Sequence, residues 1–88
     1  MKLPHLERVI KGFANGRRIQ ILELLDKKPD MSLLDIADEL KVDFRTAGEH
    51  TRKLAIAGLI LKRHNGQVVE HAISPRGKVV LKFCRKLE

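Results

Sequence analysis

The fold is decided by residues 32–58, which read SLLDIADELKVDFRTAGEHTRKLAIAG. The stretch opens with Ser32 followed three residues later by Asp35, the pattern of a capping box, in which the hydroxyl accepts from a backbone N–H and the carboxylate reaches back. A helix is therefore expected from this point to about Leu40. Its core-facing side would be formed by Leu33, Ile36, Ala37 and Leu40.

A second helix is expected after a turn of only about three to four residues. Asp43 can cap it, so that it runs from Phe44 to about Ala57, and Gly58 ends it. Its inward-facing positions are Ala47, Thr51 and Leu54. Two short helices around so brief a turn form a helix-turn-helix unit.

Two further helices are expected on the N-terminal side of this unit. Apolar residues recur at three- to four-residue steps from Leu3 to Phe13, which predicts a short amphipathic helix broken by Gly12 and Gly16. Asn15 offers an N-cap to the next helix, which is expected to run to about Lys27, before Pro29 and Asp30.

On the C-terminal side, the spacing of apolar residues changes from the helical period of 3.6 residues towards the period of two that is typical of strands. Residues 59–63 and 68–73 are β-prone runs around His64-Asn65-Gly66-Gln67, and Asn-Gly is a strong hairpin signal because both residues accept positive φ. Ser74-Pro75 then predicts the start of a last helix, with Ser at the N-cap and Pro at its first position.

Length and composition favour a single small globular domain over residues 1–88. With 43% apolar and 33% charged residues, the chain has no apolar stretch near the roughly 18 residues of a membrane span, and no signal peptide is visible. The single Cys84 cannot form an internal disulfide. We therefore expect a cytoplasmic protein whose small core favours oligomerisation.

Positive charge is concentrated in the second half of the chain. The net charge is +7: residues 1–44 carry eight basic and eight acidic residues, whereas residues 45–88 carry ten basic residues against three acidic ones. A basic half on a small domain is typical of proteins that bind polyanions. Nucleic acid is the favoured partner, although membrane surfaces and acidic proteins would attract the same charge.

The order of the expected elements resembles a winged helix-turn-helix domain, a mainly α fold with a small β-hairpin wing. The resemblance is to transcription regulators of the ArsR type, with MarR-type features, and covers about residues 13–80. Residues 15–22 resemble N-P-x-R-x-x-I-L, residues 33–40 the second helix, and residues 73–77 the L-T-p-x-G that closes a MarR-type wing. Thr46-Ala47 with His50, Leu54, Ala57, Gly58, Leu59 and Ile60 resembles the run S-T-V-S-x-H-L-x-x-L-x-x-A-G-L-V. Gly48 and Thr51 depart from this pattern, standing where Ser and Leu are usual.

The recognition helix of such a domain would be residues 44–57, whose first turns can enter a major groove. Arg45 is the best candidate for reading a base, because its planar fork can bond guanine bidentately, and Glu49 can accept from a cytosine amino group. His50 is expected either to bond a phosphate or to be half-buried and structural. The other candidates on this helix are Phe44 and Thr46 in the first turn, and Arg52 and Lys53 towards phosphates. A solvated helix face with a cap is the alternative.

The wing would be residues 62–68, on the flanking backbone or minor groove. Its candidate contacts are Lys62, Arg63, His64 and Gln67. The alternative is an edge hairpin protected from strand pairing by its charge. Arg17 and Arg18 are poorly placed for the helix dipole, which favours a phosphate contact or a salt bridge to the acidic residues between Asp35 and Asp43.

The sequence shows no catalytic motif, so no enzymatic activity, cofactor or metal site is predicted. The four histidines have no i, i+4 pairing, and there is no Gly-rich phosphate loop or nucleophile elbow. The cysteine pair usual in metal-sensing ArsR proteins is also missing. A small-molecule effector and a redox role for Cys84 stay open.

Apolar rows on the two terminal helices predict a homodimer. They comprise Leu3, Leu6, Ile10 and Phe13 at one end, and Val80, Phe83, Cys84 and Leu87 at the other. The alternative is that these helices pack on their own domain. The sequence thus predicts a dimeric regulator that binds specific double-stranded DNA; the competing interpretation is a winged-helix module that binds protein or RNA.

Overall fold

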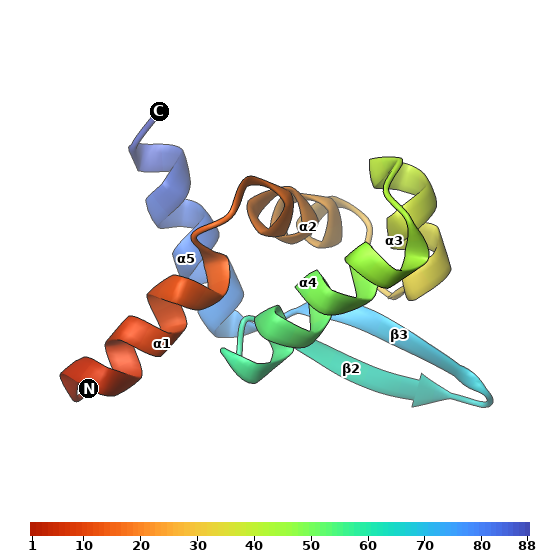
Figure 1. Ribbon diagram of the computed structural model, residues 1–88, viewed down its shortest axis with the longest axis horizontal. Helices are drawn as coiled ribbons and strands as arrows, with labels where there is room; N and C mark the ends of the chain where they lie inside the picture. Colours follow the sequence, from red (N-terminus) through yellow and green to blue (C-terminus); the bar gives the residue numbers. More distant parts are fainter.

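The computed structural model describes residues 1–88 as five helices and a three-stranded antiparallel sheet (Figure 1). The elements follow one another as α1 (Leu3–Phe13), α2 (Gly16–Lys27), β1 (Met31–Ser32), α3 (Leu33–Leu40), α4 (Phe44–Ile56), β2 (Ile60–Asn65), β3 (Val68–Ile73) and α5 (Pro75–Lys86). The three turn residues between α3 and α4 confirm the predicted helix-turn-helix unit.

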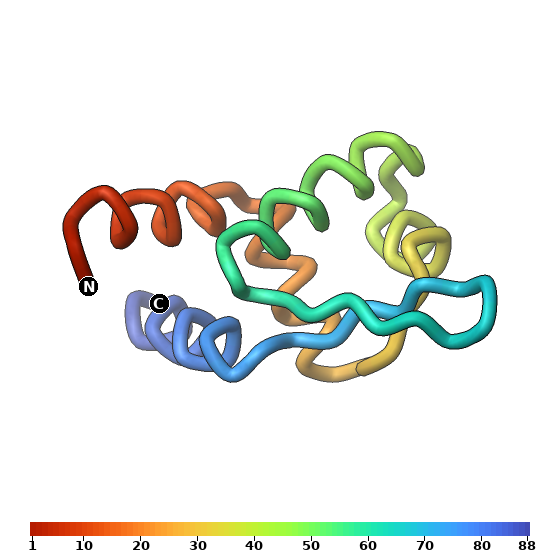
Figure 2. The backbone as a smooth tube through the Cα atoms, turned by 90° about the horizontal axis from the view of Figure 1, so that it is seen from below, coloured from red at the N-terminus to blue at the C-terminus, as the bar shows by residue number.

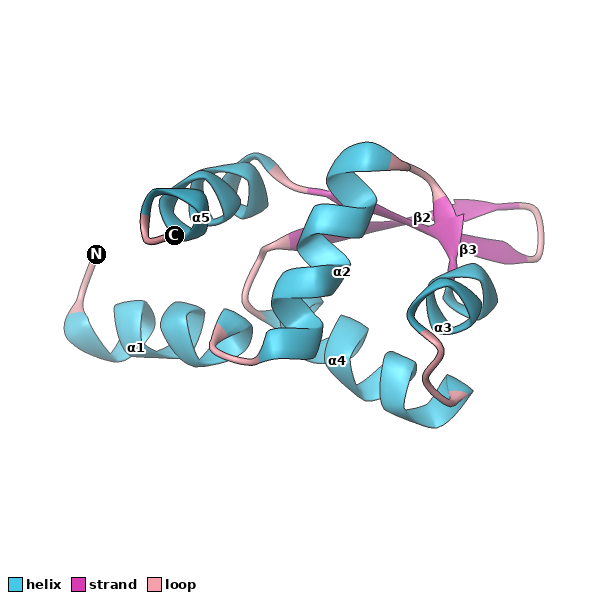
Figure 3. Cartoon of the chain, turned by 90° about the horizontal axis from the view of Figure 1, so that it is seen from above, coloured by secondary structure: helices cyan, strands magenta, loops and turns pink.

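Helix α2 lies at the centre of the fold, with α1, α3, α4, α5 and β3 packed around it (Figure 3). Ile21, Leu22 and Leu25 on this helix have no exposed surface. They join Ile36 of α3 and Leu54 of α4 in one apolar core cluster. The core thus holds the two helices of the helix-turn-helix unit against a common support.

Side-chain caps define where four of the helices begin, as the sequence predicts. Asn15 accepts from the backbone N–H groups of α2, Ser32 from that of Asp35 (3.1 Å) and Asp43 from that of Thr46 (2.8 Å). Ser74 accepts from the Gly77 N–H at the start of α5. Only the hydroxyl half of the expected capping box at Ser32 is formed, because the Asp35 carboxylate makes no hydrogen bond back.

The N-terminal helix differs from the prediction at Gly12. Helix α1 continues through Gly12 to Phe13, and the chain leaves the helix only at Ala14. Gly12 is buried against Ala57, the residue that follows α4, so the absence of a side chain serves helix packing there and does not break the helix.

Strand β1 was not expected from the sequence, because two residues are too few to show an alternating pattern. It pairs with β3, which also pairs with β2, and Met31 lies opposite His71. The ring of His71 is 3% exposed and its Nδ1 donates to the Met31 carbonyl oxygen at 2.9 Å. This side-chain bond fastens the short strand to the hairpin.

The hairpin turns one residue later than predicted. Asn65 is the last residue of β2 and pairs with Val68, so the loop consists of Gly66 and Gln67. Gly66 has a φ of 66°, whereas Asn65 is not among the residues with positive φ. A glycine at the first loop position is the requirement of a type II′ turn, which leaves Asn65 free to extend the strand.

Helix α5 meets the start of β2 in a contact that excludes any side chain at residue 77. A Cβ on Gly77 would lie 2.1 Å from the Leu59 carbonyl oxygen and 2.7 Å from Cγ1 of Ile73. The Ser74 hydroxyl completes this joint, because it donates to the Gly58 carbonyl oxygen at 2.6 Å while accepting from the Gly77 N–H at 2.9 Å.

We predict that Gly77→Ala destabilises the protein at or above the upper end of the about 1–3 kcal/mol typical of overpacking, because backbone must move. Gly16→Ala is the matched control: nothing lies within 4 Å of its Cβ position, so a gain of about 0.4–1 kcal/mol is expected. Urea unfolding of both variants measures the difference. Equal effects would contradict the close contact at Gly77.

Candidate nucleic-acid interface

Helix α4 has one face in the core and one in solvent. Ala47, Thr51 and Leu54 are buried as predicted, and the Thr51 hydroxyl donates to the Gly48 carbonyl oxygen at 3.0 Å, which explains how a polar residue takes an inward position. The opposite face carries Phe44, Arg45, Glu49 and Arg52, all exposed. None of the three charged side chains on this face forms an ion pair within the chain. They are free to meet a ligand.

Thr46 has a different role from the one the sequence suggested. Its backbone N–H and its hydroxyl both donate to the Asp43 carboxylate at 2.8 Å. These two hydrogen bonds lower the pKa of Asp43 below its ordinary value. The Thr46 side chain is therefore engaged in capping α4, and only by giving up this bond would it reach a base.

His50 is half-buried and bonded to Arg18, the structural alternative of the two predicted for it. The Arg18 Nε donates to His50 Nδ1 at 3.1 Å, so the neutral ring carries its proton on Nε2. Burial lowers the pKa of His50 below 6.5, and the positive charges of Arg18, Lys53 and Arg17 lower it further, while Glu49 opposes them.

Neither arginine at the start of α2 forms the expected salt bridge to the acidic segment. Arg18 points instead to the end of α1, where its Nη1 donates to the carbonyl oxygens of Lys11 (3.0 Å) and Gly12 (3.4 Å). Arg17 is exposed and its Nη1 donates to Oε1 of Gln20 at 3.2 Å. The last carbonyl groups of a helix lack hydrogen-bond partners within that helix. Arg18 therefore bonds these groups of α1 and not the carboxylates of the acidic segment.

On the hairpin, Lys62, His64 and Gln67 are exposed, and Gln67 lies in the turn itself. Arg63, in contrast, is engaged in an ion pair within the chain. Its Nη2 lies 2.6 Å from Oδ1 of Asp30, in the loop before β1, and both side chains are about half exposed. This pair ties β2 to the loop, so Arg63 is less available than Lys62.

The terminal helices both lie at one end of the molecule, and several of their apolar residues are uncovered (Figure 1). The exposed ones are Leu3, Leu6 and Ile10 on α1, and Val79, Phe83 and Leu87 on α5. Val79 was missed, because it falls beside the predicted row. Three of the predicted interface residues pack into the protein's own core instead: Val80 is buried, and Phe13 and Cys84 are half-buried against the core.

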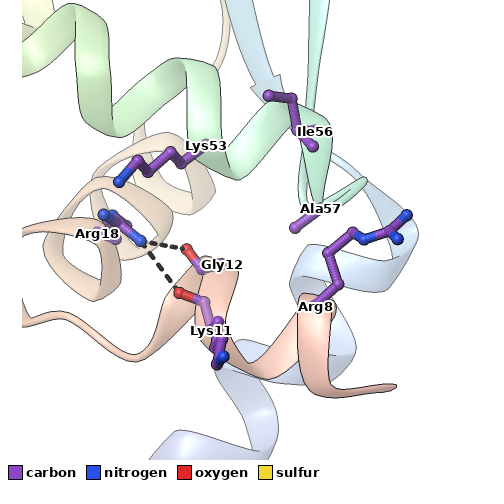
Figure 4. A pocket seen from close by; sticks show the side chains of 7 residues that line it. All are labelled: Arg8, Lys11, Gly12, Arg18, Lys53, Ile56 and Ala57. Atoms are coloured by element: carbon purple, nitrogen blue, oxygen red, sulfur yellow. Dashed lines mark hydrogen bonds between the residues drawn. The ribbon is translucent and has the colours of Figure 1, made fainter. Parts of the chain in front are cut away.

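A basic pocket between α1, α2 and α4 did not emerge from the sequence (Figure 4). It has a volume of about 200 Å³, and its charged lining consists of Arg8, Lys11, Arg18 and Lys53. The one available sequence signal was the spacing of Arg8 and Lys11, which share a side of α1. The apolar row of α1, from which the helix was predicted, gives no indication of this basic pair.

None of the helices has the length and apolar character needed to cross a membrane. The structure also brings together no group of three or more His, Cys, Asp or Glu side chains able to hold a metal ion.

A comparison with known families identifies the segment from α2 to the end of α4. Residues 15–60 match the family of winged helix-turn-helix DNA-binding domains. The chain belongs to this family. It is a DNA-binding domain of the kind found in transcription regulators. A comparison with curated protein sequences finds no match.

Solved structures confirm the resemblance to an ArsR-type regulator, and a MarR-family regulator that is 19% identical shares the fold. The chain is 28% identical to the homodimeric DNA-binding domain of Mb0332 from Mycobacterium bovis, described as a possible ArsR-family regulator, over 97% of this chain and 79% of that one (TM-score 0.87). It is 26% identical to reduced HlyU from Vibrio cholerae over 96% and 88% of the two chains (0.79). FabT from Streptococcus pneumoniae, solved in complex with DNA, shares the fold at 18% identity over 83% and 53% (0.75).

We predict that Arg18→Met raises the pKa of His50 towards 6.5, because the substitution removes a nearby positive charge and a hydrogen bond to the neutral ring. Titration of the ring by NMR measures it. Arg17→Met is the matched control, since Arg17 is the weakest of the named influences and makes no bond to the ring. Equal pKa shifts in both variants would show that the Arg18–His50 hydrogen bond does not contribute to the lowered pKa of His50.

Proposed function

We propose that the protein is a sequence-specific transcription regulator without enzymatic activity, and that α4 enters the major groove of DNA. The observation that carries this proposal is the solvent face of α4, where Arg45, Glu49 and Arg52 have no partner within the chain. A free guanidinium fork in the first turn suits bidentate bonding to guanine. Phe44 is 56% exposed beside it, and an apolar side chain there suits a thymine methyl group.

We propose that the hairpin lies along the flanking backbone or minor groove. It projects beyond the helices at the end of the molecule opposite α1 and α5 (Figure 1). Lys62, His64 and Gln67 would make these contacts, with Arg63 held back by Asp30. Arg17 and Arg52 remain candidates for phosphates, as does the Nε2 of His50.

A homodimer through α1 and α5 is the assembly we propose. The uncovered residues of the two helices lie at one end of the molecule, and the similar domain of Mb0332 is homodimeric. A two-fold axis at this end would set two copies of α4 about 34 Å apart, the distance between half-sites on one face of DNA.

One observation favours the competing function as a protein-binding module. A groove of about 660 Å³ lies between α3, the start of α4 and the hairpin, and its lining is mainly apolar. Leu34, Phe44 and Val68 line it with about half of each side chain exposed. Such a surface suits an apolar segment of a partner protein.

Selection from a random duplex library by the purified protein tests the DNA proposal. On the preferred site, Arg45→Ala should cost about 1–3 kcal/mol and relax preference at one base position. Lys62→Ala should instead weaken all sequences alike and reduce the slope of log affinity against log salt by about 0.9 for each phosphate that the variant no longer neutralises. Failure to enrich any sequence, with no salt-dependent duplex binding, would leave the protein-binding module as the function.

The dimer is tested by Phe83→Glu with Leu87→Glu, which places charges on the uncovered face of α5. We expect a folded monomer in sedimentation, with DNA affinity reduced at least tenfold, because the second half-site no longer binds in the same event. Leu34→Glu is the control for sedimentation, an equally exposed apolar residue on α3, and its DNA affinity is not compared because Leu34 lines the groove beside Phe44 and Gln67. A wild-type protein that sediments as a monomer at micromolar concentration with undiminished affinity would rule out this assembly.

A further inference from the structure

We infer that the basic pocket between α1 and α4 is a binding site for a phosphate group. Its seven lining residues include Arg8 and Lys11 of α1, Arg18 of α2 and Lys53 of α4, and no acidic residue. Helices α1 and α4 lie end to end along one side of the molecule, so the pocket opens beside the recognition helix (Figure 2).

Arg18 is fixed in the pocket wall before any ligand arrives. Its Nη1 donates to the carbonyl oxygens of Lys11 and Gly12 (Figure 4). Its Nε donates to Nδ1 of His50, and Nη2 makes no hydrogen bond within the chain. The guanidinium is therefore oriented with free donors to spare. Such orientation reduces the entropy cost of binding an anion.

The other cations of the pocket are largely uncompensated. Arg8 and Lys53 form no ion pair, and Lys11 has only Glu7, 2.8 Å away on the exposed surface of α1. Like charges brought together repel one another, and a bound anion removes this repulsion. Phosphate fits because it accepts from several donors at once and pairs well with arginine.

Size and access agree with this ligand. The volume of about 200 Å³ greatly exceeds the about 10–15 Å³ that one water requires. Ile56 and Ala57 supply an apolar floor from the end of α4. On α1, Lys11 also borders the hollow lined by the uncovered Leu3, Leu6 and Ile10, whereas Arg8 does not, so a dimer formed through that face would lie beside the pocket.

Two sources can supply the phosphate: the backbone of bound DNA or a free phosphorylated molecule. The DNA source rests on the proposed function, whereas the free source does not. The same pair of variants distinguishes them. Arg8→Gln with Lys53→Gln removes two charges from the pocket and leaves Arg18 in place, while Lys27→Gln with Lys78→Gln removes two exposed charges elsewhere.

The first measurement follows backbone amide shifts during titration with inorganic phosphate, with ionic strength held constant by chloride. We expect saturable shifts around Gly12, Arg18 and Lys53 in the wild type and in the control, and at least a tenfold weaker response in the pocket variant. The second measures duplex affinity against salt, where one fewer neutralised phosphate per subunit lowers the slope by about 0.9 per subunit.

Phosphate binding with a reduced DNA slope in the pocket variant alone supports the DNA backbone as the source. Phosphate binding with equal slopes in the pocket and control variants supports a free phosphorylated ligand. If the pocket variant matches the control in both measurements, the site is overturned, whether or not the protein binds DNA. If phosphate binds the pocket but no variant binds any duplex, the proposed function fails and the site stands.

Discussion

The structure depends on the burial of one face of α2. Ile21, Leu22 and Leu25 are fully enclosed, and every other helix packs against the helix that carries them. Truncating one such leucine to alanine typically costs about 2–5 kcal/mol, a large part of the about 5–15 kcal/mol that stabilises a folded domain. Because α3 and α4 reach the same support, the angle between them is set by core packing. The short turn of three residues only has to connect them.

Much of the architecture was readable because each helix start carries its own chemical signal. Asn15, Ser32, Asp43 and Ser74 are short polar residues just before apolar periods, and each one accepts a backbone N–H in the structure. The turn between β2 and β3 was misplaced by one residue, since a glycine can take the second central position of a type I′ turn or the first of a type II′ turn, and strand pairing decides between them. The sequence of strand β1 carries no strand pattern, and the strand forms because its backbone pairs with the free edge of β3.

The exposed residues of the candidate site could be predicted from the sequence, whereas the hydrogen bonds and ion pairs among its residues could not. The sequence identified the solvent face of α4, because helical periodicity fixes which residues share a side. It carries no information on partners far apart in the chain, such as Arg18 with His50 or Arg63 with Asp30, which are 32 and 33 residues apart. The same holds for the terminal rows, where Val80 belongs to the core cluster and Phe83 is exposed, a difference that their spacing in the sequence does not show.

The joint at Ser74 has a consequence for the DNA that such a dimer would recognise. One hydroxyl links the carbonyl that follows α4 to the first turn of α5, and Gly77 leaves no space there for adjustment. Helices α4 and α5 are therefore held in one relative position at this joint. In a dimer of this kind, the two recognition helices would require one fixed rotation between the half-sites around the DNA axis. One added base pair changes that rotation by about a tenth of a turn. Spacing in the operator would then be read as strictly as base identity.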